Sequence, residues 1–383
     1  AAEWTVYATL PPGRFACFGD GWPERTPEVA FMTALAAATG HPVLQDYALL
    51  HMGETANPYH LLWLEAELPG HSPQGVWPLG KAFPENSALL FSRSSWDPQQ
   101  PEMVVYGKAK RAQNHGHNDL GQLCIDVLGK RLIVDPGSPS SYPADFFDAA
   151  RFEYYNASVR GHNILMFGGR EQRHPPHDRG VKGLLDLEPM NGRIRQSGFD
   201  DRLGGFWQID LTRAYDGVLR VVRTVIHLLP GWVAVLDEAE LEQPEAVFLR
   251  WHTIVPSPPD SEGHFRVAEG AARLACQLVV LEGVNREPPR LQQHAYHAPY
   301  DRDRTGEKLE QRHEPYVEQV LRDQRCRILT LFAKEETGRP TRWHADGDRW
   351  FWTDGRDSAE AACGSGFLEL SHRMTGRALR VEL

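Results

Sequence analysis

Two histidines separated by one residue, His115 and His117, are the residues of this sequence best placed to do chemistry. In a strand, residues i and i+2 point to one face and lie about 6.7 Å apart, so one metal ion could recruit either imidazole or both. Asp135 ends the strand that follows a predicted hairpin at Gly129, which lets its carboxylate lie beside the pair, and His162 would add a third nitrogen. Two imidazoles and one carboxylate, with water in a fourth position, are a common ligand set for zinc.

The spacing of His115 and His117 is weak evidence for a metal site when taken alone. The chain has 17 histidines in 383 residues, so such pairs also arise by chance, and surface or hydrogen-bonded core histidines are the plain alternative. A cupin-like metalloenzyme also carries two histidines at this spacing on a strand. Cupins place a glutamate shortly after the pair, whereas this sequence continues with Gly121, Gln122 and Leu123, which argues against that class.

A longer ordered motif surrounds the pair. It comprises His115-Gly-His117-Asn-Asp119, Gly129 to Gly137, Tyr142, and Tyr154-Tyr155-Asn-Ala-Ser-Val-Arg-Gly-His162-Asn163. This motif resembles the central signature of the heparinase II/III-like polysaccharide lyases. Trp251-His252 is similar to a later β-sandwich strand of that family, and Gly13 to Asp20 resembles the segment before the last helices of its helical toroid. The resemblance spans most of the chain, and 114–163 is its specific part.

The resemblance implies a fold and a set of roles. It implies an incomplete α/α toroid packed on antiparallel β-sandwich sheets, with the sugar in the cleft between them. His115 matches the catalytic histidine of the family. His117, Asp135 and His162 match the ligands of a metal, expected to be Zn²⁺ rather than Ca²⁺, that mainly holds the loops of the cleft in place.

The chemistry implied is β-elimination beside a uronic acid. A base removes the C5 proton, the carboxylate is neutralised, and the O4 leaving group receives a proton. We expect His115 to act as the base or as the partner of the carboxylate, because an ordinary histidine pKa of about 6.5 makes either protonation state accessible. Tyr142, Tyr154 and Tyr155 are candidates for the second proton carrier, and we name Tyr155 as catalytic. Packing against a neighbouring strand is the alternative for each tyrosine.

Polar side chains near the motif could bind an acidic glycan. We expect Asn114, Arg151 and Arg160 to contact uronate or sulfate groups, with solvated loop arginines as the alternative. Asp119 could orient His117 or cap a turn. Asn163 would hold its loop through hydrogen bonds to the backbone.

The elements that must position these residues change character along the chain. Val29 to Thr39, Pro42 to Met52 and Pro58 to Glu65 carry apolar residues at helical spacing, and Gly40 ends the first of them. From Ala88 onward, short β-branched and aromatic runs are bounded by turn residues, among them 232–237 and 246–251 as two separate strands. Hairpins are expected at Gly129 and at Pro230-Gly231. We therefore predict an α+β fold: a helical segment at 1–86, the end of an incomplete α/α toroid, followed by a large antiparallel β-sandwich domain at 87–383.

The composition limits the partners of the chain. Forty-one Lys and Arg against 51 Asp and Glu give a formal net charge of −10, which argues against nucleic acid as a partner. An anionic ligand must therefore meet a local group of basic side chains. No segment approaches the roughly 18 apolar residues of a membrane span. The five cysteines are scattered, without the paired spacing of zinc ribbons or redox motifs.

We predict a lyase that cleaves a uronic-acid-containing glycan such as heparan sulfate, heparin or alginate, with a structural zinc near the cleft. The family toroid normally adds an Asn or His and a Tyr from further upstream than this sequence reaches. These groups would come from an upstream N-terminal segment or a second chain. A bacterial periplasmic or secreted location is what the resemblance implies. The alternative to an enzyme is a non-catalytic carbohydrate-binding or structural β-sandwich with a bound metal.

Overall fold

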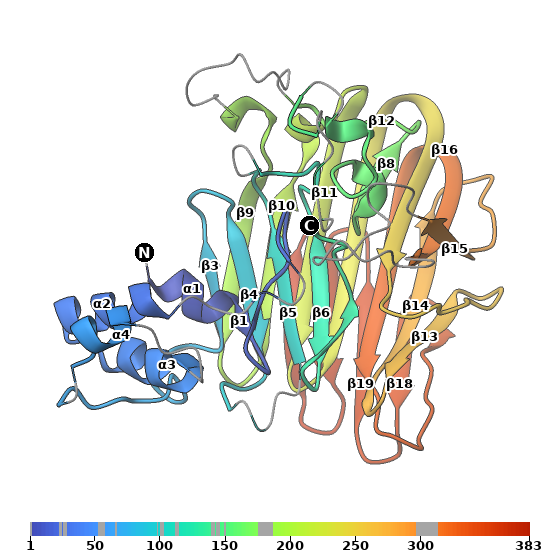
Figure 1. Ribbon diagram of the computed structural model, residues 1–383. Helices are drawn as coiled ribbons and strands as arrows, with labels where there is room; N and C mark the ends of the chain where they lie inside the picture. The colour runs from blue at the N-terminus through green and yellow to red at the C-terminus, as the bar shows by residue number, and fades with distance from the viewer. Residues whose placement is uncertain are drawn as a thin grey trace.

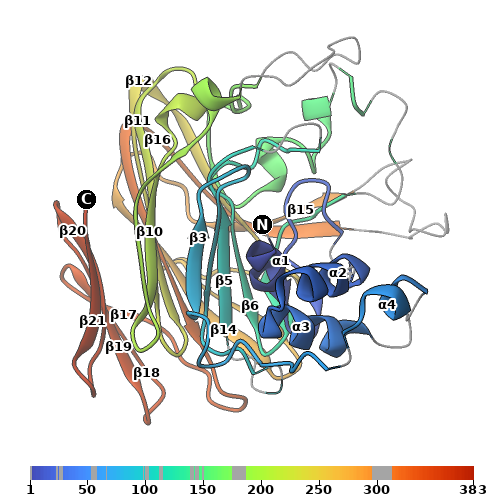
Figure 2. The same ribbon diagram turned by 90° about the vertical axis from the view of Figure 1, so that its left-hand side faces the viewer.

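Three layers of antiparallel β-sheet and one layer of short helices make up the fold (Figure 1 and Figure 2). The structure, a computed structural model, describes residues 2–383 except 23–24, 26–28, 53–57, 66, 98, 100–102, 112–114, 139–141, 143–145, 149–150, 175–186 and 296–312. The turned view in Figure 2 shows the layers in order: the C-terminal sheet, the largest sheet, a five-stranded sheet and then the helices. The middle two layers are covered on both faces and hold most of the core.

The helical layer precedes the sheets in sequence and packs on one of them. Its helices are α1 (Glu3–Ala8), α2 (Ala30–Thr39), α3 (Pro42–Met52) and α4 (Pro58–Trp63), with a small β1 (Thr9–Leu10) and β2 (Arg14–Phe15) ladder beside them. α2 ends where Gly40 takes a left-handed backbone conformation, φ 63°, which a residue without a β-carbon adopts at little cost. The predicted helices at 29–39 and 42–52 are therefore confirmed, and the one at 58–65 is shorter by two residues.

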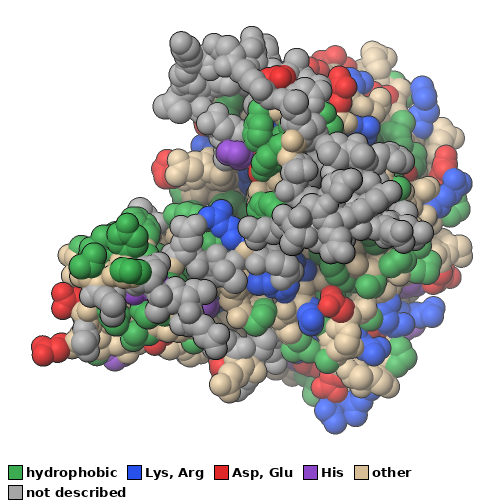
Figure 3. Space-filling model, in the orientation of Figure 1, with side chains coloured by type: hydrophobic (Ala, Val, Ile, Leu, Met, Phe, Trp, Pro, Cys, Tyr) green, Lys and Arg blue, Asp and Glu red, His purple; other side chains and the backbone are tan. Residues whose placement is uncertain are grey.

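Part of the helical layer exposes large apolar side chains. Figure 3 shows hydrophobic side chains gathered over the helices at the left of the view. The exposed ones on these helices are Trp4, Phe31, Leu49, Leu50, Tyr59, Leu62 and Trp63. The opposite side of the layer is buried against the five-stranded sheet, where Tyr7 and Tyr47 pack with Phe91 and Tyr106 in one cluster. In the parts of the chain that the structure describes, no helix is both long and apolar enough to cross a membrane.

The five-stranded sheet carries the connections that form the candidate site. Its strands run in the order β3 (Gly80–Phe83), β4 (Leu89–Arg93), β5 (Met103–Lys108), β6 (Leu123–Val127) and β7 (Lys130–Ile133). β6 is buried at every position because helices cover one face and the largest sheet covers the other. The predicted hairpin at Gly129 is present, with positive φ at both Leu128 and Gly129, as a tight two-residue β-turn requires.

The largest sheet packs on the other face of β3–β7. Its strands are β8 (Leu165–Phe167), β9 (Arg193–Asp200), β10 (Gly204–Asp210), β11 (Val218–Leu228), β12 (Trp232–His252), β13 (His264–Glu269), β14 (Ala272–Glu282), β15 (Arg290–Ala295) and β16 (His313–Lys334). β12 is one long strand in which the two runs predicted at 232–237 and 246–251 are continuous. Its pairing with β16 shifts register between Glu240 and Glu245, so a bulge joins the two runs.

The C-terminal sheet forms the outer layer. It consists of β17 (His344–Asp346), β18 (Arg349–Thr353), β19 (Ser358–Cys363), β20 (Phe367–His372) and β21 (Arg377–Glu382), paired in sequence order. Trp343, Trp350 and Trp352 are buried between this sheet and the largest one. The predicted fold class, a helical segment followed by an antiparallel β-sandwich, is confirmed. The division between residues 86 and 87 stays a prediction. β3, the first strand of the five-stranded sheet, begins at Gly80.

Candidate active site

The candidate site is built from connections at one end of the five-stranded sheet. The loop from β5 to β6 brings His115, His117 and Asp119, and the residues after β7 bring Asp135. The segment before β8 brings Arg151 and, further on, the loop of His162 and Asn163. The histidine pair lies in a loop, so the premise that a strand places both rings on one face is wrong. The side chain of His115 is 64% exposed, whereas that of His117 is fully buried.

Asp20 links the two histidines. Its Oδ2 accepts from Nδ1 of His115 at 2.7 Å and its Oδ1 accepts from Nε2 of His117, also at 2.7 Å. Burial would raise the pKa of Asp20, but hydrogen bonds and charge from His117 and the charge of Arg151 outweigh it and lower the pKa to about 2. An ionised carboxylate only accepts hydrogen bonds, so these two ring nitrogens carry the protons. Asp20 thereby fixes the tautomer and orientation of both rings.

The segment that carries Asp20 approaches the histidine loop closely. The backbone N–H of Asp20 donates to the carbonyl oxygen of His115 at 3.1 Å. A β-carbon on the preceding Gly19, φ 56°, would lie 2.6 Å from the same oxygen, so this approach requires glycine. The family resemblance includes Asp20 in the segment Gly13 to Asp20 but assigns it no role. The signal available was an acidic residue between two glycines, Gly19 and Gly21.

Arg151 forms an ion pair with Asp20. The guanidinium is fully buried, and its Nη2 donates to Asp20 Oδ2 at 3.1 Å and to the Gly116 carbonyl oxygen at 3.2 Å. It also lies 4.4 Å from the ring centroid of Phe146 and 5.0 Å from that of Phe147. The expected contact between Arg151 and a glycan stays a prediction. In this structure the arginine positions Asp20 and the histidine loop.

Aromatic side chains border the exposed ring of His115. Phe147 meets it edge to face with 5.3 Å between ring centroids, and Tyr142 stacks obliquely on Phe147 at 4.9 Å. Tyr142 is 38% exposed, and its hydroxyl accepts from Ser138 Oγ at 2.9 Å. Burial raises the pKa of Tyr142, and the charge of Asp20 adds to that rise. We call Asp20, His115, Tyr142, Phe147 and Arg151 the His115 cluster.

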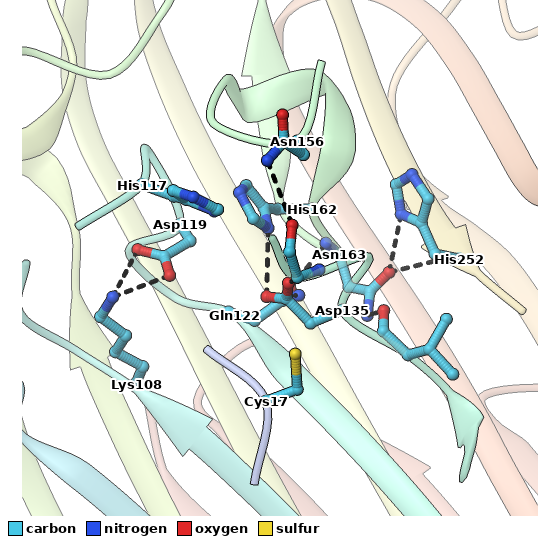
Figure 4. Close-up of polar contacts among 12 residues, drawn as sticks. Cys17, Lys108, His117, Asp119, Gln122, Asp135, Asn156, His162, Asn163 and His252 are labelled. Carbon is cyan, nitrogen blue, oxygen red and sulfur yellow. Dashed lines mark hydrogen bonds and ion pairs between the residues drawn. The ribbon is translucent and has the colours of Figure 1, made fainter. Parts of the chain in front are cut away.

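The predicted zinc ligands His117, Asp135 and His162 lie near one another (Figure 4). His162 Nδ1 is 3.3 Å from Asp135 Oδ2, and the rings of His117 and His162 are 5.4 Å apart at their centroids. Nδ1 of His117 and both ring nitrogens of His162 are buried without a hydrogen-bond partner. Burial lowers the pKa of His117, which favours the neutral ring with a lone pair on Nδ1.

Asp135 is held by its own neighbours. Gln122 Nε2 donates to Asp135 Oδ2 at 2.9 Å, and the Gly137 N–H donates to Oδ1 at 2.8 Å. Within the described ranges, no three His, Cys, Asp or Glu side chains form a closed cluster of metal ligands. The donor types and the unsatisfied imidazole nitrogens nevertheless have the chemistry that zinc requires. His117, Asp135 and His162 therefore fit the predicted metal by donor chemistry.

Asp119 serves a different contact from the one expected. Both its oxygens accept from Nζ of Lys108, at 2.8 and 2.7 Å, in a pair that is almost fully buried (Figure 4). The charge of this pair is thus neutralised within the core rather than used to hold His117 directly. Arg111 supports the loop instead, with Nε donating to the carbonyl oxygen of His117 at 3.2 Å.

Tyr155 belongs to a buried network next to the predicted ligands. His252 donates through its N–H and Nδ1 to Asn163 Oδ1, at 2.7 and 3.1 Å, so its Nε2 accepts from the Tyr155 hydroxyl at 2.7 Å. Burial raises the pKa of Tyr155 and lowers that of His252. Asn163 Nδ2 donates to the carbonyl oxygens of Leu123 and Val134, which bears out the expectation that Asn163 holds its loop through the backbone.

Two further residues, Arg160 and Asn114, are expected to contact the substrate. Arg160 is half-buried, its Nη2 donates to the carbonyl oxygen of Glu153 at 2.6 Å, and its Nε donates to Ser158 Oγ at 3.1 Å. Asn114 lies outside the described residues. Both assignments stay predictions.

Comparisons with known proteins agree with the motif. The family model described as Heparinase II/III-like, C-terminal, matches residues 104–343, which is more than half of the chain. No curated protein matches the sequence. A crystal structure of heparinase III aligns with a TM-score of 0.68 at 13% identity, over 100% of this chain and 54% of that one.

Two further solved structures share the fold. A heparinase III that is the BT4657 gene product aligns with a TM-score of 0.62 at 14% identity, over 100% of this chain and 52% of that one. The heparan sulfate lyase HepC from Pedobacter heparinus aligns with a TM-score of 0.60 at 15% identity, over 99% and 51%. The chain therefore spans about half the length of these structural neighbours.

Proposed function

Because the chain belongs to the heparinase II/III-like family, we propose that it forms part of a polysaccharide lyase acting on a uronic-acid-containing glycan. The substrate class is heparan sulfate or a related uronate polymer such as heparin or alginate, and the reaction is β-elimination. Two of the structural neighbours named above are a heparinase III and a heparan sulfate lyase, which favours heparan sulfate. The observation that carries the proposal is the exposed ring of His115, held from behind by a buried carboxylate.

His115 supplies the proton-transfer atom in this proposal. Its Nδ1–H is committed to Asp20, so Nε2 is the atom left to take the C5 proton or to donate to the substrate carboxylate. The Asp20–Arg151 contact keeps the carboxylate in place while the ring charge changes. Proton transfer at a ring that already has its productive orientation avoids reorganisation during the reaction.

Tyr142 is the tyrosine that the geometry favours as the second proton carrier. It shares Phe147 with His115, is partly exposed, and lies close enough to Asp20 to feel its charge. The Tyr155 hydroxyl donates into the buried network of His252 and Asn163, and only 8% of the residue is exposed. Tyr155, named from the sequence, is therefore the alternative to Tyr142.

Zinc is proposed as a structural metal of this site. His117, Asp135 and His162 would hold it, and the bound metal would supply fixed positive charge that ties the histidine loop to the segment before β8. His115 lies two residues before His117, a proposed ligand. The bound metal would therefore also hold the backbone at His115 in place. No step of the elimination is assigned to the metal.

The helical layer is proposed to continue in further helices. Seven of the described large apolar side chains on α1–α4 are exposed, and the structural neighbours are about twice as long as this chain. An upstream segment of the polypeptide, or a second chain, would cover this face and complete the cleft. A periplasmic or secreted location is part of the same proposal.

The direct test is turnover by His115→Gln. The chain, alone and with the proposed upstream segment, is incubated with heparan sulfate, heparin and alginate, and ultraviolet absorbance of the unsaturated uronate is followed. We expect product from the parent and a fall of about 10²–10⁴ in kcat for the variant, the usual contribution of a general base. Glycan binding with no turnover in parent or variant would instead favour the non-catalytic binding module.

A further inference from the structure

A pocket of about 300 Å³ lies between the helical layer and the end of β4. Its walls include Thr9 and Tyr47 from the helical layer, Ser72 from the chain after α4, and Arg93 and Trp96 at the end of β4. This volume is at the lower end of the range of about 300–1,000 Å³ typical of small-molecule sites. A ligand no larger than a single sugar unit fits it.

The pocket is separate from the His115 cluster. Pro11 of its wall packs beside Gly129, and Arg14 Nη2 donates to the Gly129 carbonyl oxygen at 2.9 Å. Gly129 lies at the hairpin end of β6, whereas Gln122, which holds Asp135, lies at the opposite end of that strand. The length of β6 puts roughly 20 Å between these ends. A ligand in the pocket would thus be remote from the proposed chemistry.

Arg93 is a buried cation at the wall of this pocket. It is 3% exposed, and within the described chain its guanidinium makes one hydrogen bond, from Nη2 to the Tyr7 carbonyl oxygen at 2.6 Å. Its Nε is buried without a partner, and the guanidinium lies 3.8 Å from the ring centroid of Trp96. No Asp or Glu forms an ion pair with Arg93 within those same residues.

Two other buried arginines of the described chain have an anion, whereas Arg111 and Arg131 bond to carbonyl or amide oxygens. Arg151 is paired with Asp20, and Arg223 is paired with Asp237 through two hydrogen bonds of 2.7 and 2.9 Å. An arginine has five N–H donors, and burying its charge without an anion is costly. The ring of Trp96 offsets part of that cost, but it satisfies no N–H donor. The N–H donors of Arg93 that have no partner among the described residues suit a carboxylate, which accepts charge-assisted hydrogen bonds.

The other polar groups along the pocket suit hydroxyls rather than a second anion. His51 also lines the pocket, and burial lowers its pKa, which favours the neutral ring. Thr9 Oγ1 and the Tyr47 hydroxyl are 2.7 Å apart, and Ser72 is exposed at the rim. Asp46 also lines the pocket, and burial raises its pKa. A carboxylate near Asp46 would be repelled, whereas a ligand hydroxyl could donate to it. The ligand must therefore carry its negative charge at one end and hydroxyls at the other.

We propose that this pocket is a second carbohydrate site, which binds one hexuronic acid unit with its carboxylate on Arg93 and its hydroxyls toward Asp46, Thr9 and Ser72. A free uronic acid and the terminal uronate of a glycan chain present the same chemistry. The site does not depend on the proposed lyase activity, because binding here can be measured without turnover.

The test is isothermal titration of the full chain with D-glucuronate. Its methyl ester, which keeps the hydroxyls and loses the charge, is the matched ligand control, and an oligosaccharide ending in glucuronate separates a chain end from a free sugar. We expect glucuronate to bind at least about tenfold more tightly than the ester, the change that loss of one charged contact brings. Binding of the oligosaccharide as well would assign the site to chain ends, and its failure to bind would assign it to the free acid.

Two variants locate the binding. Arg93→Met keeps an apolar stem of similar length and removes the charge, so it should fold and bind glucuronate no better than the ester. Ser72→Phe fills the rim from an exposed position and should abolish binding with an unchanged melting temperature. Arg170→Ala removes an exposed arginine elsewhere and should bind like the parent. Equal binding of glucuronate and ester, parent-like binding by Arg93→Met and Ser72→Phe, or sulfate binding as tightly as glucuronate would overturn the proposal.

Discussion

Replacing Asp20 by asparagine separates the positioning role of this residue from the chemistry of His115. Asp20 is 4% exposed and accepts from three cationic or polar partners: His115, His117 and Arg151. Asparagine is isosteric and keeps one acceptor oxygen, but it removes the one negative charge that contacts buried Arg151 among the described residues. Breaking a buried pair in this way costs roughly 3–5 kcal/mol.

The structure places the expected loss at the lower end of that range. The Gly116 carbonyl oxygen still accepts from Arg151 in the variant, and the contact with His115 is screened because that ring is exposed. We therefore expect Asp20→Asn to lower the free energy of unfolding by about 3 kcal/mol. We also expect kcat to fall about 10²–10⁴-fold with little change in KM, because the ring of His115 loses its fixed tautomer.

The assay pairs urea denaturation with turnover of heparan sulfate. Glu335→Gln is the matched control: Glu335, just after β16, is almost fully buried and accepts from Arg266 of β13 through two hydrogen bonds of 2.6 and 3.0 Å, outside the candidate site. This control should lose stability and keep kcat. An Asp20→Asn protein with parent-like kcat, or a Glu335→Gln protein that loses kcat equally, would refute the positioning argument.

Three further predictions follow from other parts of the structure. Tyr142→Phe should lower kcat by about 10²-fold or more, whereas Tyr155→Phe should keep most turnover and lower the free energy of unfolding by about 1 kcal/mol; the reverse order would return the catalytic role to Tyr155. His117→Ala and Asp135→Asn should lose stoichiometric zinc in elemental analysis while His227→Ala, at a buried histidine bonded to Ser92, keeps it; a parent protein without zinc would contradict the metal assignment. Trp343→Ala should lower the free energy of unfolding by about 3–5 kcal/mol in urea, because Trp343 is fully buried between the C-terminal sheet and the largest sheet, and a loss below about 1 kcal/mol would contradict that packing role.

Local signals predicted the helices and the tight hairpins because the causes are local. Gly40 ends α2 and Gly129 forms the β6–β7 turn for reasons that a few neighbouring residues contain. The split of β12 into two predicted strands had a local cause as well. The polar run Glu242-Gln-Pro244 reads as a turn, yet a bulge absorbs it within one continuous strand.

The site was predicted in part, and the missing part is long-range. The motif from His115 to His162 named residues that the fold does bring near one another. It could not identify Asp20, which lies 95 residues before His115 and meets it only because the chain after β2 returns to the β5–β6 loop. Nor could it separate Arg151 from a solvent-facing arginine, because burial of that side chain depends on Phe146 and Phe147 closing over it.

The central claim, cleavage by β-elimination, is tested most directly by the masses of the products. A heparan sulfate oligosaccharide of defined length is digested and its two fragments are weighed by mass spectrometry. Elimination predicts fragment masses that sum to the mass of the substrate, with an unsaturated uronate on one fragment that His115→Gln fails to produce. Fragment masses that sum to the substrate plus one water would show hydrolysis and contradict the account.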